Sequence, residues 1–172
     1  MKEISVIIPV YNSSDTLNNL FERLNSVMKH LSSDYEIIFV NDASVDNSYE
    51  ILKHISMNNE NIKCIDLNKN FGQHNALLCG IRNASYDIII TLDDDLQNPP
   101  EEIPKLINKL DEGYDVVYGY PKEEKHGYFR NLASKITKFA LKTAMGVENA
   151  RHVSSYRAFN KILADSFESY KG

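Results

Sequence analysis

Short apolar runs alternate with segments of helical spacing along most of the chain. The runs are rich in isoleucine and valine and predict strands at residues 4–8, 36–40, 62–67, 86–92 and 116–118. Between them, apolar residues three and four positions apart predict helices at 15–31, from 47 onward, at 76–83 and at 104–112. Pro9 is expected to end the first strand. This alternation predicts an α/β fold, a Rossmann-like and mostly parallel sheet sandwiched by helices.

The size and composition suit one domain spanning residues 1–172. Hydrophobic residues make up 42% of the 172 residues, which is ordinary for a globular protein. No apolar run approaches the ~18 residues of a membrane span, and no signal-peptide core follows Met1. Cys64 and Cys79 lack a CxxC spacing and are expected to be reduced, in a cytoplasmic protein. We expect no nucleic-acid partner, and the oligomeric state stays open.

Charge is distributed unevenly along the chain. Residues 1–121 carry nine basic and 19 acidic side chains, whereas residues 122–161 carry nine basic and three acidic ones. The basic segment includes an apolar stripe over 129–140 that predicts an amphipathic helix. This helix either packs on the sheet or lies on a membrane, and its basic face meets an anionic surface or only solvent.

The strand predicted at 86–92 leads directly into three adjacent carboxylates, Asp93, Asp94 and Asp95. Ligands of open α/β sheets bind outside the carboxyl ends of the strands, which is where this cluster falls. Three neighbouring aspartates repel one another unless a cation lies among them, and a divalent ion prefers such oxygen ligands. The alternative is a solvated acidic loop without a ligand.

Two other strand ends carry polar residues. Tyr11 follows the first strand and offers a ring that stacks on a base, and Asp42 follows the second and offers an acceptor for a ring N–H. His74 lies at a predicted helix start, where backbone N–H groups either bind a phosphate or only form a capping turn. The chain has no GxGxxG or GxxxxGK[ST] motif, which argues against dinucleotide oxidoreductases and P-loop NTPases.

Several motifs together resemble one family. They are VIIPVYN at 6–12, EIIFVNDAS at 36–44, NFGQ at 70–73, LDDDLQNPP at 92–100, DVVYG at 115–119 and SYRAF at 155–159. The chain resembles the family-2 glycosyltransferases of the GT-A fold, and within them the polyprenyl-phosphate glycosyltransferases. The resemblance covers nearly all of the chain. It implies an enzyme that moves a sugar from a nucleotide-diphosphate donor, preferably a UDP-sugar, with inversion, to a polyprenyl phosphate.

The resemblance also implies site residues and a Mg²⁺ or Mn²⁺ cofactor. The residues expected to catalyse are Asp93, Asp95 and Arg130. Those expected to bind the nucleotide are Pro9, Tyr11, Asn12, Asp42, Ser44, Asn70, Gln73, Asp93 and Asp94. The metal is expected on Asp93, Asp95 and Gln97, and the acceptor on Ser155, Tyr156 and Arg157. Asp94 occupies a middle position that is usually small in these enzymes, and Pro121 stands where they often place an arginine.

The acceptor prediction also has support from the residues. No Asp or Glu occurs among residues 149–160, and a phosphate acceptor needs no general base because it is already anionic. A sugar-hydroxyl acceptor of cell-surface polysaccharide synthesis stays open, as do a nucleotidyltransferase and a non-catalytic nucleotide-binding module. These enzymes usually continue into membrane helices, so the resemblance implies a truncated catalytic domain that works at the cytoplasmic face of the membrane.

Overall fold

The computed structural model describes residues 2–32, 34–119 and 155–163. The helices and strands in these ranges are β1 (Glu3–Val10), α1 (Leu17–Leu31), β2 (Asp34–Asn41), α2 (Ser48–Met57), β3 (Ile62–Asp66), α3 (Gln73–Arg82), β4 (Ile88–Thr91), the 3-10 helix η1 (Pro100–Glu102), α4 (Ile103–Asp111), β5 (Val116–Tyr118) and β6 (Arg157–Asn160). The predicted amphipathic helix at 129–140 and Arg130 lie outside the described residues. None of the described helices has the length and apolar character needed to cross a membrane.

The strands form one sheet in the order β3-β2-β1-β4-β6-β5. Strands β1 to β4 run parallel to one another, and β6 runs antiparallel to both of its neighbours, β4 and β5. The expected α/β architecture is therefore confirmed. Strand β6 is an addition that the apolar pattern did not predict.

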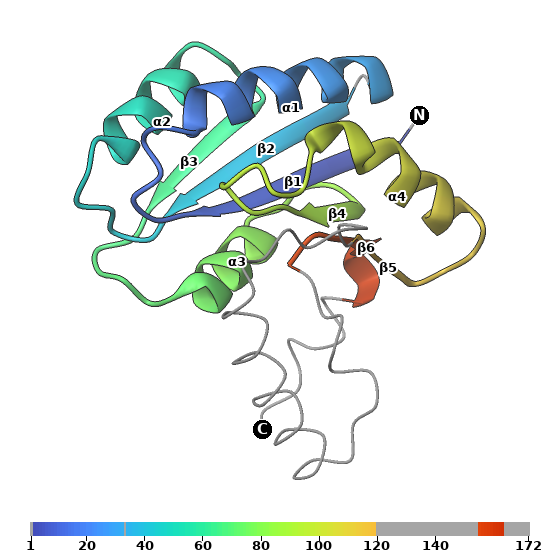
Figure 1. The fold of residues 1–172 in the computed structure, drawn as a ribbon. Coiled ribbons are helices and arrows are strands. Elements are labelled where there is room, and N and C mark those ends of the chain that lie inside the picture. Colours follow the sequence, from blue (N-terminus) through green and yellow to red (C-terminus); the bar gives the residue numbers. More distant parts are fainter. Residues whose placement is uncertain (1, 33, 120–154, 164–172) are drawn as a thin grey trace, which may run out of the picture.

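Helices cover both faces of the sheet (Figure 1). Alternate residues of β1, such as Ile4, Val6 and Ile8, pack with the apolar sides of α1, α2 and α4. The intervening Ile7 packs on the opposite face with Leu77 of α3. Burial on both faces explains why these strands read as nearly continuous apolar runs.

Two prolines act differently from the sequence expectation. The prediction that Pro9 ends the first strand was wrong, because β1 continues to Val10. Pairing with β4 extends only to Ile7, so the missing N–H of Pro9 costs no ladder bond on that side. Helix α4 begins at Ile103 rather than at Pro104, which lies in the first turn where a proline is tolerated.

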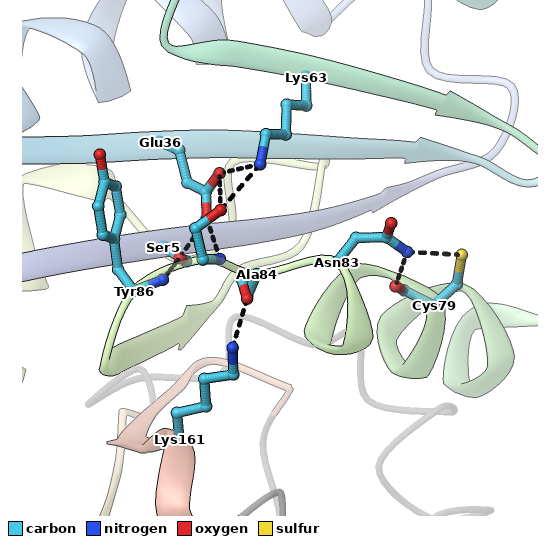
Figure 2. A network of polar contacts seen from close by, with 9 residues as sticks. Ser5, Glu36, Lys63, Cys79, Asn83, Ala84, Tyr86 and Lys161 are labelled. Atoms are coloured by element: carbon cyan, nitrogen blue, oxygen red, sulfur yellow. Dashed lines mark hydrogen bonds and ion pairs between the residues drawn. The ribbon is translucent and has the colours of Figure 1, made fainter.

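A buried carboxylate joins α3 and β4 to the middle of the sheet (Figure 2). Glu36 of β2 is 4% exposed and accepts hydrogen bonds from Ser5 Oγ at 2.6 Å and from the Ser85 backbone N–H at 2.5 Å. Lys63 of β3 lies 2.5 Å from the same carboxylate. Burial raises the pKa of Glu36, but the hydrogen bonds from Lys63, Ser5 and Ser85 outweigh burial, so its pKa lies below the ordinary value. These contacts fix the start of β4 relative to β1 and β2.

Candidate functional site

A cleft of about 570 Å³ opens at the carboxyl ends of the parallel strands. Open α/β sheets bind ligands at this edge. The cleft is lined by Pro9, Val10, Tyr11, Asp42, Asn70, Gly72, Gln73, His74, Leu77, Asp93, Asp94, Asp95, Ser155 and Arg157. Most of the residues that the sequence singled out therefore meet in one place, although they are distant in the chain.

The loop after β1 presents Tyr11 to the cleft, with 49% of its surface exposed. The next residue, Asn12, adopts a left-handed φ of 54° and points away toward the loop after β2. Its N–H donates to Ser44 Oγ at 3.0 Å, and its side-chain oxygen accepts from the Val45 N–H at 2.8 Å. Asn12 and Ser44 therefore join two loops and are not among the residues that line the cleft, so the nucleotide contacts expected for them stay predictions.

Asp42 holds the loop that precedes α3. It is 2% exposed, and its two oxygens accept the backbone N–H groups of Phe71 at 2.7 Å and Gly72 at 2.8 Å. Gly72 has a φ of 87°, a conformation that favours glycine. The carboxylate expected to meet a base thus also fixes residues 70–72, and with them the direction in which Gln73 leaves the loop.

Gln73 and Ser155 hold Asp93 from two sides. Gln73 Nε2 donates to Asp93 Oδ1 at 2.6 Å, and Ser155 Oγ donates to Asp93 Oδ2. Thr91 Oγ1 donates to the Ser155 backbone oxygen and so secures that segment to the end of β4. Burial raises the pKa of Asp93, the hydrogen bond from Ser155 opposes this, and the charge of Asp95 raises the pKa further.

Asp94 turns toward the loop after β1. Its Oδ2 accepts from Ser13 Oγ at 2.5 Å and from the Tyr11 backbone N–H at 3.3 Å. Its backbone oxygen accepts from Thr16 Oγ1 at 2.8 Å. Burial is again the largest cause that raises the pKa of Asp94, and the charge of Asp95 adds to it.

Asp95 is the exposed member of the triplet, and its Oδ1 accepts the Gln97 backbone N–H at 3.0 Å. Gln97 is exposed and does not line the cleft, so its predicted metal contact stays a prediction.

Within the described residues, no three acidic, histidine or cysteine side chains converge as a preformed metal cage. Mg²⁺ often takes only one or two carboxylates and completes its shell with water and substrate phosphates. Burial first, and the charge of Asp95 in addition, raise the pKa values of Asp93 and Asp94, and a cation would relieve the repulsion among these carboxylates.

The start of β6 and the residue two positions before it also line the cleft. Ser155 and Arg157 line it, and within the described residues Arg157 is the permanently charged cation of that lining. The Nε of Arg157 is buried and has no hydrogen-bond partner among the residues that the structure describes. Tyr156 is 3% exposed and packs in the core, where burial, the largest cause, raises its pKa. Tyr156 is therefore not among the residues that line the cleft, and its expected acceptor contact stays a prediction.

Four residues of the cleft were not among the predicted site residues. They are Val10, Gly72, His74 and Leu77. Val10 and Gly72 belong to motifs that were recognised, and His74 was noted only as a residue of a helix start. Leu77 carries no polar group, and only the packing of α3 beside β1 places it there.

Comparisons with known proteins agree with this geometry. The model of the family described as "Glycosyl transferase family 2" matches residues 5–166. Among solved structures, S. aureus TarS 1-349 superposes with a TM-score of 0.69 at 17% identity, over 99% of this chain and 50% of that one. Glucosyl-3-phosphoglycerate synthase from Mycobacterium tuberculosis, in complex with Mn²⁺, UDP and phosphoglyceric acid, superposes with a TM-score of 0.68 at 23% identity, over 94% of this chain and 57% of that one.

These likenesses show the fold, and this chain spans about half the length of those proteins. The family match covers almost the whole chain and argues against the nucleotidyltransferase and the non-catalytic module. The chain belongs to glycosyl transferase family 2 and has the GT-A fold.

Proposed function

We propose that this protein transfers a sugar from a UDP-sugar to a polyprenyl phosphate, with inversion at the anomeric carbon and with Mg²⁺ or Mn²⁺. The observation that carries the proposal is the composition of the cleft. Its lining includes the ring of Tyr11, the carboxylates of Asp93 and Asp95, and the cation Arg157. A base, a metal-bound diphosphate and an anionic acceptor require these three kinds of group.

The donor would lie along the strand ends. Tyr11 offers an exposed ring for stacking on the base, and Pro9, Asp42 and Asn70 line the same part of the cleft. Support for UDP comes from related folds, since TarS 1-349 is known in complex with UDP-GlcNAc and the mycobacterial synthase in complex with UDP.

The metal would be held by Asp95, with Asp93 and Gln97. When bound, the ion neutralises the diphosphate that leaves with the nucleotide. Asp93 is oriented by Gln73 and Ser155, so one carboxylate of the site is fixed before any ligand arrives. Such fixed orientation avoids reorganisation during the reaction.

The acceptor is proposed to be a phosphate because the cleft supplies a cation and little that would act as a base. The carboxylates of Asp42, Asp93 and Asp94 all accept hydrogen bonds from the protein. The buried Nε of Arg157 has no acceptor in the described part of the chain, and a phosphate oxygen would satisfy it. A polyprenyl phosphate resides in a bilayer, so we also propose that the protein works at the cytoplasmic membrane face, with the basic segment 122–161 toward the anionic lipids.

A sugar-hydroxyl acceptor is the second candidate, and one observation favours it. His74 lines the cleft and is a side chain capable of taking a proton from a hydroxyl. The mycobacterial synthase, whose structure contains phosphoglyceric acid, also shows that the fold accommodates acceptors other than lipids.

Product analysis separates the two candidates. The protein would be incubated with Mn²⁺ and radiolabelled UDP-glucose or UDP-GlcNAc, with either undecaprenyl phosphate or a soluble glycan. We expect label in the organic phase only with undecaprenyl phosphate, in a β-linkage, and none with Asp95→Ala. Label transferred only to the soluble glycan would overturn the lipid-phosphate proposal and favour the second candidate.

A further inference from the structure

Asp94 has a geometry that its two neighbours do not share. Asp93 is held by Gln73 and Ser155, and Asp95 is exposed, but the carboxylate of Asp94 reaches the loop after β1. We call residues 11–16 the Tyr11 loop. The resemblance to the polyprenyl-phosphate enzymes implies a nucleotide contact for Asp94, although this middle position is usually small in them.

Three hydrogen bonds join residue 94 to the Tyr11 loop. Ser13 Oγ and the Tyr11 N–H both donate to Asp94 Oδ2, at 2.5 and 3.3 Å. Thr16 Oγ1 donates to the backbone oxygen of Asp94 at 2.8 Å. Ser13 Oγ also lies 3.2 Å from the Tyr11 backbone oxygen, so the hydroxyl bridges the carboxylate and the residue that presents the ring.

The Tyr11 loop is also held by the loop after β2 and by the first residue of α2. The N–H of Ser13 donates to Ser48 Oγ at 2.9 Å, and the N–H of Ser14 donates to Asp46 Oδ2 at 3.0 Å. Those contacts act on residues beyond Tyr11. Of the side-chain contacts among the described residues, the one from Asp94 reaches the N–H of Tyr11 itself.

We propose that Asp94 is a positioning residue that latches the Tyr11 loop to the acidic loop and so fixes the ring of Tyr11 for the nucleotide base. The proposal rests on the proposed function for its nucleotide, and its structural part stands apart from that function. It replaces the direct nucleotide contact that the resemblance implied for Asp94. An acid at this position is compatible with a metal site because its carboxylate accepts hydrogen bonds from two donors of the Tyr11 loop.

Amide exchange in the ligand-free protein tests the latch. In the Asp94→Ala variant, exchange of the Tyr11 and Ser13 amides should accelerate by roughly tenfold, the factor expected when a hydrogen bond to a charged group is lost. Asp94→Asn keeps an acceptor oxygen and should restore most of the protection, and Ser13→Ala should reproduce part of the acceleration. Amides of α4 should exchange as in the wild type, which controls for a general loss of stability. Unchanged exchange at Tyr11 in both Asp94→Ala and Ser13→Ala would overturn the proposal.

Calorimetry with UDP tests the consequence for binding. With chelator present, Asp94→Ala should weaken UDP binding about five- to tenfold, Asp94→Asn should restore it, and Asp95→Ala should bind like the wild type. Mn²⁺ should increase the UDP affinity of the wild type and of Asp94→Ala by the same factor. It should not increase the UDP affinity of Asp95→Ala. A loss in Asp94→Ala that appears only with Mn²⁺ would make Asp94 a metal ligand and refute the latch. Failure of the wild type to bind UDP would refute the proposed donor, and the amide exchange would still decide the latch.

Discussion

Replacing Asp42 should destabilise the protein through the loop before α3. In the wild type, the two oxygens of Asp42 accept the N–H groups of Phe71 and Gly72 at 2.7 and 2.8 Å, and the side chain is 2% exposed. Asn in place of Asp leaves one oxygen and turns an NH₂ group toward the second N–H. A buried donor without an acceptor costs about 1–3 kcal/mol, and the remaining hydrogen bond loses its charge, so Asp42→Asn should lower the free energy of unfolding by about 2–4 kcal/mol.

Urea unfolding followed by far-ultraviolet circular dichroism measures this change, because the chain has no tryptophan for fluorescence. Asp66→Asn is a suitable control, since Asp66 Oδ1 accepts from Asn41 and an amide oxygen replaces it directly. Asp42→Asn should also speed amide exchange at Gly72, and it should weaken nucleotide binding through the displaced Gln73. If the unfolding free energy changed by less than about 0.5 kcal/mol and exchange at Gly72 stayed normal, Asp42 would not stabilise the loop before α3. Its role would then be ligand binding alone.

Three further predictions concern Glu36, Gly80 and Arg157. Because the folded-state pKa of Glu36 is lowered, its stabilisation is present above the ordinary glutamate pKa and is lost as pH falls through the lower folded value. Glu36→Gln should therefore cost about 2 kcal/mol at pH 7 in urea unfolding and much less near pH 3, and an equal cost at both pH values would contradict the assignment. Gly80→Ala places a Cβ against Ile7 Cγ2 and should destabilise by about 1–2 kcal/mol despite its better helix propensity; a rise in the melting temperature would show that α3 can shift away from β1. Arg157→Gln should raise the KM for undecaprenyl phosphate about tenfold, from loss of one charge-assisted hydrogen bond, and an unchanged KM would remove Arg157 from the acceptor site.

The sheet could be predicted from the sequence because each parallel strand is an apolar run that ends in polar residues. That pattern located the ends of β1, β2 and β4 and therefore brought Tyr11, Asp42 and Asp93 to one edge. Strand β6 escaped prediction because only Ala158 and Phe159 of its four residues are apolar. Its place beside β4 depends on long-range pairing, which local patterns do not encode.

The roles of individual side chains were harder to predict than their position in the chain. Asn12 and Ser44 follow strand ends as expected. The left-handed conformation of Asn12, however, directs its N–H toward Ser44. Tyr156 lies between two residues that line the cleft, yet its own side chain is 3% exposed and packs in the core. Motifs identify which segments form a site, but the directions of side chains depend on turns and register.

The most direct test of a metal-dependent UDP-sugar transferase is a calorimetric titration of UDP, GDP and dTDP into the protein, with Mn²⁺ and then with chelator. UDP should bind in preference to GDP and dTDP, and chelation should weaken its binding at least tenfold. The same weakening should appear in Asp95→Ala with Mn²⁺ present. Equal binding of all three nucleotides without a metal effect, or no binding of any, would contradict a metal-dependent UDP-sugar transferase.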